Sequence, residues 1–133
     1  VQEKFDIIVL LQPTSPYRTA YHIEEAFEVC KTNSIYSLVS VSEIDKSPYW
    51  CFWRNKGHLE PIIEGEGRHN RRQDLEKAYA LNGAIYIVEV EKFMDNKLFL
   101  YKNSRSYVMN KESSIDIDDW IDFKLAQLLL GEK

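Results

Sequence analysis

The chain has 133 residues and a formal net charge of −4 at pH 7, which bounds its class before any motif is considered. This length predicts one domain, residues 1–133, that is large enough to bury a core. A hydrophobic share of 44% with a charged share of 29% is typical of a globular protein and excludes a disordered or fibrous one. The negative balance argues against a nucleic-acid partner, which usually meets a broad basic face.

No apolar stretch approaches the roughly 20 residues that a membrane-spanning helix needs, because the longest run covers only residues 7–11 (IIVLL). The chain begins at Val1 without Met, and no charged-then-apolar leader opens it. We therefore expect no membrane partner and a cytoplasmic location. Cys30 and Cys51 lack metal-ligand spacing, so a zinc site is not expected and both are interpreted as reduced thiols.

The first expected element is a strand at residues 5–11, whose continuous apolar run is typical of a strand buried on both faces of a parallel sheet. Residues 12–18 (QPTSPYR) contain two prolines, which exclude a helix and predict a stiff turn. Polar side chains on this turn favour a cradle for a nucleotide or sugar, because ligands of open α/β sheets bind beyond the carboxyl ends of strands. A structural turn whose prolines are its whole purpose is the alternative. The polar residues are Gln12, Thr14, Ser15 and Arg18.

A helix begins after Thr19, its expected N-cap, and a strand at residues 34–42 (SIYSLVSVS) follows it. A helix between two strands predicts a parallel crossover. The fold class expected is therefore α/β with a mostly parallel sheet.

Residues 46–75 differ from the rest in their aromatic content and predict a protruding arm. Two strands, at residues 48–54 and 58–63, are expected on either side of a turn that contains Gly57. A ribbon this apolar is expected to pack on a large surface, and a second copy of the chain is the expected partner.

The end of this arm places four potential cations in five positions, namely Arg68, His69, Arg71 and Arg72. A solvated loop is the simpler interpretation of such a cluster. Arginine side chains also match carboxylates and phosphates with two parallel hydrogen bonds, which favours a binding role.

The next strand is expected at residues 82–88, entered through an Asn-Gly pair that suits positive φ. Asn82 can serve this turn and Tyr86 the core, without any further role. A short helix at residues 90–96 and short strands at 98–101 and 106–109 complete the pattern.

Residues 113–120 (SSIDIDDW) contain the most informative pair of acidic residues. An extended backbone would place Asp116 and Asp118 on one face, roughly 7 Å apart at their Cα atoms. Their repulsion is relieved by a hard divalent ion, Mg²⁺ or Mn²⁺, which takes carboxylate oxygens and leaves room for substrate phosphates. The sequence therefore predicts a metal site here.

A helix is expected directly after this pair, because residues 121, 125, 128 and 129 place apolar side chains on one face. The alternative role of the acidic residues is to begin this helix, with Asp118 or Asp119 as cap and Asp122 complementing the dipole. The two roles are compatible. No nucleophilic triad and no glycine-rich phosphate loop is found elsewhere.

Three motifs in this order resemble those of the acylneuraminate cytidylyltransferases, that is, CMP-sialic acid synthetases and close relatives. They are residues 10–18 (LLQPTSPYR), residues 71–75 (RRQDL) with 82–87 (NGAIYI), and residues 114–118 (SIDID). The resemblance covers residues 5–130 and implies a Rossmann-like nucleotidyltransferase sheet. It also implies transfer of CMP from CTP to the anomeric hydroxyl of a nine-carbon α-keto sugar acid, with release of pyrophosphate.

The resemblance assigns roles to single residues. Asp116 and Asp118 would hold the Mg²⁺ ion that neutralises the phosphates. Gln12 would bind the sugar, Ser15 would lie near the nucleotide, and Asn82 would lie at the sugar site.

Two further roles concern the rest of the sugar. Tyr86 and Phe99 would line the pocket for its acyl group. Arg72 would reach the sugar carboxylate in the site of a neighbouring subunit, since the family resembles homodimers that exchange a protrusion.

Departures from the family narrow these implications. Trp50 stands near the place where some sialic-acid members have a lysine, which leaves legionaminic- and pseudaminic-type sugars open. The family begins with an Arg-, Gly-, Ser- and Lys-rich loop that holds CTP, and nothing here matches it. The chain is therefore expected to correspond to the carboxyl-terminal part of such an enzyme, with little or no activity alone. The alternatives are an enzyme of the CMP-keto-deoxyoctonate type and a non-catalytic assembly module.

Overall fold

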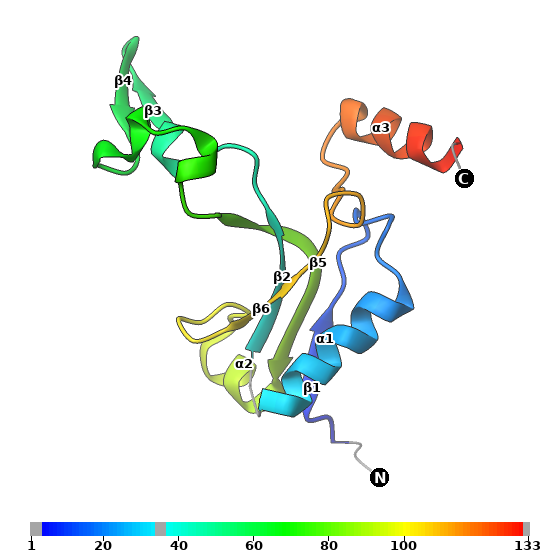
Figure 1. Cartoon of the computed structure of the whole chain (residues 1–133). Helices are drawn as coiled ribbons and strands as arrows, with labels where there is room; N and C mark the ends of the chain where they lie inside the picture. The colour runs from blue at the N-terminus through cyan, green and yellow to red at the C-terminus, as the bar shows by residue number, and fades with distance from the viewer. Residues whose placement is uncertain (1–3, 34–36, 132–133) are drawn as a thin grey trace. The chain divides into compact units, whose positions relative to one another are not determined.

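The computed structural model describes residues 4–33 and 37–131, which form two compact units. One unit comprises residues 1–42 and 81–133, and the other comprises residues 43–80. The elements of the sheet and the helices appear in Figure 1. In chain order they are β1 (Ile7–Leu10), α1 (Ala20–Asn33), β2 (Ser37–Glu43), β5 (Tyr79–Glu89), α2 (Val90–Asn96), β6 (Arg105–Val108) and α3 (Trp120–Gly131). None of the described helices has the length and apolar character needed to cross a membrane.

The described strands pair in the order β1-β5-β2-β6, with β5 between β1 and β2 (Figure 1). β1 and β5 are antiparallel, with Leu10 opposite Tyr86, whereas β2 and β6 are parallel, with Leu38 opposite Arg105. The prediction of a mostly parallel sheet is therefore wrong. An apolar run does not determine strand direction, and β1 lies at the edge of the described sheet with Ile7 43% exposed, so the expectation of a strand buried on both faces is wrong as well. β5 lies between the two strands that α1 connects.

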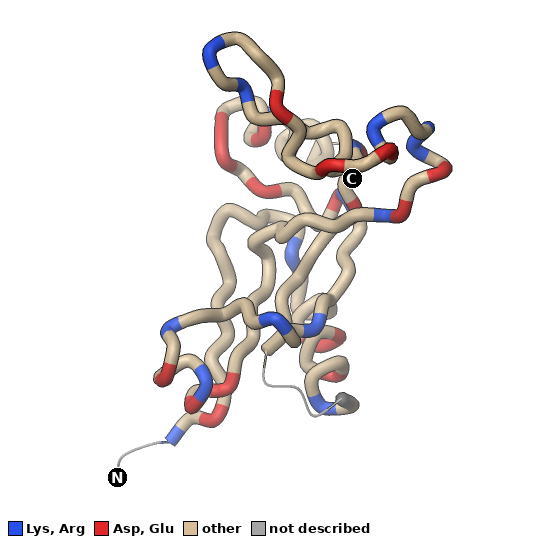
Figure 2. The backbone as a smooth tube through the Cα atoms, turned by 90° about the vertical axis from the view of Figure 1, so that its left-hand side faces the viewer, with Lys and Arg blue, Asp and Glu red and all other residues tan. Residues whose placement is uncertain are grey.

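The core lies between α1 and the sheet. The buried members of this cluster are Ala26, Cys30, Leu38, Ala84, Ile85, Ile87, Tyr107 and Met109. The strands β1, β2, β5 and β6 carry charged residues only at their ends, and many of the other charged residues lie in loops and helices (Figure 2). Burial raises the pKa of the Cys30 thiol and keeps it protonated.

A hydrogen bond between two titratable groups joins α1 to β6. The Tyr107 hydroxyl donates to Glu25 Oε2 over 2.5 Å, and the Tyr21 hydroxyl donates to Glu25 Oε1 over 2.6 Å. Both bonds hold the pKa of Glu25 below its usual value, and the bond from Tyr107 has the larger effect. Burial and the Glu25 bond raise the pKa of Tyr107.

Two expected strands are absent from the described residues. Residues 98–101 form no strand, because Ser37 Oγ donates to the Phe99 carbonyl and Ser104 Oγ accepts from the Tyr101 N–H, over 2.6 and 2.7 Å. The stretch expected as extended at residues 113–118 is a turn followed by irregular backbone. The expected strand at residues 34–42 is observed from Ser37 on, and residues 34–36 lie outside the described residues.

The unit of residues 43–80 contains the expected hairpin, formed by β3 (Phe52–Asn55) and β4 (His58–Pro61). Its two-residue turn has positive φ at both positions, +47° at Lys56 and +92° at Gly57, as a type I′ turn requires. Trp53 and Leu59 are each 64% exposed. The role of residues 46–75 as a dimerisation arm stays a prediction.

Candidate functional site

Gln12 and Asp116 meet over Gly83 in the larger unit. Gly83 has φ of +72°, as the Asn-Gly pair predicts, and an added Cβ would lie 2.1 Å from Gln12 Oε1. The same Cβ would lie 3.4 Å from Asp116 Oδ2. Two side chains from distant segments thus approach one backbone position, where both the positive φ and the nearby side chains favour glycine.

The loop of residues 12–18 is fixed to its neighbours by hydrogen bonds from three directions. Arg18 Nη1 donates to the Gln12 carbonyl over 2.8 Å and to the Ala84 carbonyl over 3.0 Å, which joins the loop to β5. The Thr14 carbonyl accepts from the Ile117 N–H over 2.9 Å, and the Tyr17 hydroxyl donates to the Ala126 carbonyl over 2.7 Å. The stiff turn that the prolines predict is therefore also held by contacts far away in the sequence.

Ser15, on the same loop, is buried, and its hydroxyl oxygen has no hydrogen-bond partner among the described residues. A buried hydroxyl without a partner is uncommon, because its desolvation is then uncompensated. Its position in the loop is compatible with the predicted role near the nucleotide.

The acidic stretch, residues 113–120 with Asp122, contains the cap of a helix and two further carboxylates that take no part in this cap. Asp119 Oδ1 accepts from the N–H groups of Ile121 and Asp122 over 2.7 and 3.1 Å, and Asp122 Oδ2 accepts in return from the Asp119 N–H over 3.1 Å. This reciprocal arrangement is a capping box that begins α3. Asp119 therefore caps the helix, and Asp118 contributes only its backbone N–H, which also donates to Asp122 over 3.1 Å.

The carboxylates of Asp116 and Asp118 are not used in this cap. Asp116 is partly buried, and its Oδ1 is buried without a hydrogen-bond partner, while Asp118 is exposed. The expected strand at this point is wrong because Ile117 bonds to Thr14 and the preceding residues form a turn, with the Ser114 N–H donating to the Lys111 carbonyl over 3.3 Å.

The chemistry of these two residues is compatible with a hard divalent ion. Asp116 has one buried carboxylate oxygen without a protein partner, Asp118 two residues later has an exposed carboxylate, and Mg²⁺ takes carboxylate oxygens as ligands. No group of three or more His, Cys, Asp or Glu side chains with metal-binding geometry occurs among the described residues. An ion held here would therefore need its remaining ligands from substrate phosphates and water, which is the usual arrangement for Mg²⁺.

Asn82 lies in β5 directly before Gly83, but its side-chain amide is bonded to the protein. Its Oδ1 accepts from Ser40 Oγ over 2.5 Å and from the Ala84 N–H over 3.2 Å, and its Nδ2 donates to Ser114 Oγ over 2.9 Å. The side chain is buried, with 6% of the residue exposed. Asn82 thus connects β2, β5 and the acidic stretch.

Tyr86 and Phe99 form an aromatic cluster beside Asp116. Their ring centroids are 5.9 Å apart, and Phe93 of α2 packs on Phe99 at 5.0 Å. Burial, and then the negative charge of Asp116, raise the pKa of Tyr86, which keeps its hydroxyl available as a donor. Sequence reasoning missed Phe93, although its place in the short helix before Phe99 was a signal.

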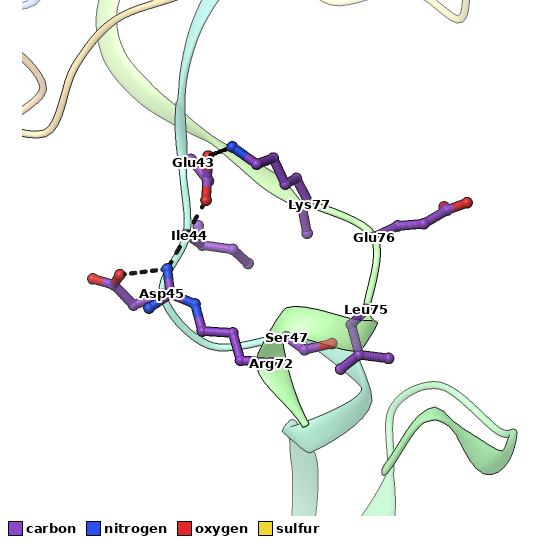
Figure 3. Close-up of a pocket in the computed structure, with 9 residues that line it drawn as sticks. Glu43, Ile44, Asp45, Ser47, Arg72, Leu75, Glu76 and Lys77 are labelled. Atoms are coloured by element: carbon purple, nitrogen blue, oxygen red, sulfur yellow. Dashed lines mark hydrogen bonds and ion pairs between the residues drawn. The ribbon is translucent and has the colours of Figure 1, made fainter. Parts of the chain in front are cut away.

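Arg72 lies in the other unit, where it lines a small cavity of about 40 Å³ together with residues 43–45, Ser47 and residues 75–78 (Figure 3). Its Nη2 is 2.9 Å from Asp45 Oδ1 and 3.9 Å from Glu43 Oε1. Lys77 Nζ is 2.8 Å from Glu43 Oε2, and this bond raises the pKa of Lys77. The structure thus brings seven of the eight predicted residues into one unit and leaves Arg72 in the other.

No model of a known protein family matches the chain. The N-acylneuraminate cytidylyltransferase of Streptococcus agalactiae serotype III is 39% identical over 116 residues, which cover 86% of this chain and 28% of the relative. The CMP-N,N′-diacetyllegionaminic acid synthase of Legionella pneumophila is 38% identical over 133 residues, 95% of this chain and 54% of the relative. Over most of its length the chain is therefore similar to members of the acylneuraminate cytidylyltransferase family.

A third member of the family, the N-acylneuraminate cytidylyltransferase of Escherichia coli O18:K1:H7, is 37% identical over 131 residues, 97% of this chain and 31% of the relative. The chain therefore spans between 28% and 54% of the length of these acylneuraminate cytidylyltransferases. The resemblance recognised in the motifs of the sequence is confirmed.

Proposed function

We propose that these residues serve a cytidylyltransferase, which moves CMP from CTP to the anomeric hydroxyl of a nine-carbon α-keto sugar acid and releases pyrophosphate. The sugar is of the sialic, legionaminic or pseudaminic type. One observation carries the proposal furthest: Asp116 keeps a buried oxygen without a protein partner, at the point where Gln12 covers Gly83. The activities for which the relatives are named support the reaction class.

In this proposal, Asp116 and Asp118 hold one Mg²⁺ or Mn²⁺ ion. When bound, the ion supplies neutralisation of phosphate charge. Ser15 offers its unpartnered hydroxyl to the nucleotide, and the Gln12 amide hydrogen-bonds the sugar. Fixing these groups before the substrates bind lowers the cost of orienting the reactants.

The aromatic cluster and Asn82 bear on the rest of the sugar. Tyr86 and Phe99 offer an apolar wall with one hydroxyl, which suits an acyl group attached through an amide. Asn82, whose amide is already bonded to three protein groups, acts at the sugar site through its neighbours.

The second unit is proposed to serve a homodimer. Its hairpin exposes Trp53 and Leu59, and aromatic side chains are enriched in the buried centres of interfaces. Arg72 pairs with the carboxylates of Asp45 and Glu43, which is the chemistry needed to hold a sugar carboxylate. A cytoplasmic site for the reaction stays a prediction.

The test is pyrophosphate release by the complete protein that contains this chain, with CTP, Mg²⁺ and a panel of keto acids. Turnover with a nine-carbon acid is expected, and Asp116→Asn should lower kcat/KM by about 100-fold or more. The matched control is Asp119→Asn, which makes the same chemical change at the capping residue and keeps a good cap, so it should retain activity.

Other outcomes separate the alternatives. Preference for the eight-carbon keto acid would favour the CMP-keto-deoxyoctonate type. No turnover with any acid, together with no binding of Mg²⁺ or Mn²⁺, would favour an assembly module. Residues 1–133 assayed alone are expected to give little turnover, because nothing in them matches the Arg-, Gly-, Ser- and Lys-rich loop that holds CTP in the family, and robust turnover would contradict that expectation.

A further inference from the structure

We propose that Ser114 is a positioning residue for the Asp116 carboxylate, which it fixes through hydrogen bonds to Asn82 and, beyond Asn82, to Ser40. The inference rests on the proposed function, in which Asp116 binds a divalent ion. The resemblance to the family gives no role to Ser114 or Ser40.

The three polar side chains form a continuous path from the core to the acidic stretch. Ser40 is 1% exposed, accepts from the Ile85 N–H over 2.7 Å and donates to Asn82 Oδ1 over 2.5 Å. Asn82 Nδ2 then donates to Ser114 Oγ over 2.9 Å. The orientation of the Asn82 amide is fixed by the Ala84 N–H, which can only donate and therefore requires the amide oxygen on its side, so that the amide nitrogen faces Ser114.

The acidic stretch depends on this path, because no strand partner holds it. Ser114 is anchored by Asn82 and Ile117 by the Thr14 carbonyl, and these two bonds tie the segment to distant parts of the chain. The N–H groups of Ser114 and Ile115 bond only within the local turn, to the Lys111 and Glu112 carbonyls over 3.3 Å. Asn82 also precedes Gly83, against which Asp116 Oδ2 lies. The Asn82 side chain therefore holds the segment that carries the Asp116 carboxylate, and Asn82 is also the backbone neighbour of Gly83, against which that carboxylate lies.

Residues that orient a metal ligand without touching the metal commonly change metal affinity by about 10- to 100-fold when they are removed. Ser114→Ala removes the acceptor of Asn82 Nδ2 and releases one of the two anchors of Asp116. We expect this change to weaken divalent-ion binding by about tenfold, near the lower limit because the Ile117 anchor remains.

The experiment is a titration of the full 133-residue chain with Mn²⁺ alone, with free Mn²⁺ followed by electron paramagnetic resonance. Ser113→Ala is the matched control, since Ser113 is a buried neighbour whose hydrogen bond to Asn110 uses the backbone N–H that alanine keeps. Ser114→Thr is the rescue variant, since it retains the hydroxyl. Thermal melting of every variant establishes that it is folded at the temperature of the titration.

The expected result is weaker Mn²⁺ binding by Ser114→Ala, with affinities near that of the unchanged chain for Ser113→Ala and Ser114→Thr. Equal affinities for Ser114→Ala and Ser113→Ala would overturn the positioning role. If Ser114→Ala does not fold, Ser40→Ala takes its place in the comparison, with the same direction expected. Loss of binding in Asp116→Asn without any effect of Ser114 or Ser40 leaves the proposed function standing and rejects this inference. No Mn²⁺ binding by the unchanged chain rejects both.

Discussion

Replacement of Gly83 by alanine tests whether the Gln12 side chain is held at a functional position. The added Cβ would lie 2.1 Å from Gln12 Oε1, whereas ordinary contact begins at 3.4 Å, so the amide must move by at least about 1.3 Å. Gln12 Oε1 is the end of a flexible side chain, so the movement itself costs little stability. A displacement of about 1 Å in a positioning group can cost about 100-fold in rate or binding.

Gly57→Ala is the matched control for backbone strain. Gly57 also has positive φ, +92°, but nothing lies within 4 Å of its added Cβ. Each substitution forces alanine into the left-handed region at about 1–2 kcal/mol, partly offset by about 0.5–1 kcal/mol from the lower entropy of the unfolded chain. Both variants should therefore lose a similar amount of stability, about 1 kcal/mol.

The assay combines urea unfolding of both variants with calorimetric binding of the nine-carbon keto acid to the complete protein, in the presence of Mg²⁺ and of CMP in place of CTP, so that no turnover occurs. Similar losses of stability are expected, with binding weakened by about 100-fold only in Gly83→Ala. Unchanged binding in Gly83→Ala, with its stability loss equal to that of Gly57→Ala, would refute the assignment of Gln12 to the sugar.

Three further predictions follow from single contacts. Asp119→Ala should lower the free energy of unfolding by about 1 kcal/mol in urea, because α3 loses its cap, and should leave the affinity for Mn²⁺ unchanged. Asp118→Ala should leave the free energy of unfolding unchanged and should weaken the binding of Mn²⁺ in a titration. Because the pKa of Glu25 is lowered in the fold, its bond with Tyr107 stabilises the fold above pH 4.5, and this stabilisation is lost as the pH falls below that value. The difference in urea midpoint between the unchanged chain and Tyr107→Phe should therefore shrink from pH 7 to pH 3. A constant difference would contradict this prediction. Arg72→Lys should change the free energy of unfolding by less than about 1 kcal/mol, because its ion pairs are exposed, but should raise KM for the keto acid at least about tenfold, and an unchanged KM would remove Arg72 from the proposed site.

Local patterns predicted the elements of this fold better than their arrangement. The helix expected at residues 90–96 is α2 with the same bounds, and the Asn-Gly pair marks positive φ at Gly83. The apolar run of β1 gave no information on strand direction, and it did not show that β1 lies at the edge of the described sheet, with Ile7 43% and Leu10 39% exposed. Direction depends on which strand becomes the neighbour, and that is decided by contacts across the whole chain.

The site was predictable in its residue types but not in how it is held. Arg18 bonds to the Ala84 carbonyl, 66 residues further along the sequence. Asn82 bonds to Ser40, 42 residues before it, and to Ser114, 32 residues after it. No periodicity reports such contacts. The acidic stretch was expected as a strand because Ile and Asp alternate, yet its backbone bonds instead to Thr14 and within its own turn.

The most direct test of the account locates a bound divalent ion in the chain. Nuclear magnetic resonance of the ¹⁵N-labelled 133-residue chain, titrated with substoichiometric Mn²⁺, reports proximity to the ion because the paramagnetic ion broadens only nearby amide signals. We predict the strongest broadening at Gly83, Asp116 and Asp118, and its loss in Asp116→Asn. Broadening centred on Glu43 and Asp45, the carboxylates beside Arg72, or broadening unchanged by Asp116→Asn, would contradict the assignment of the metal site.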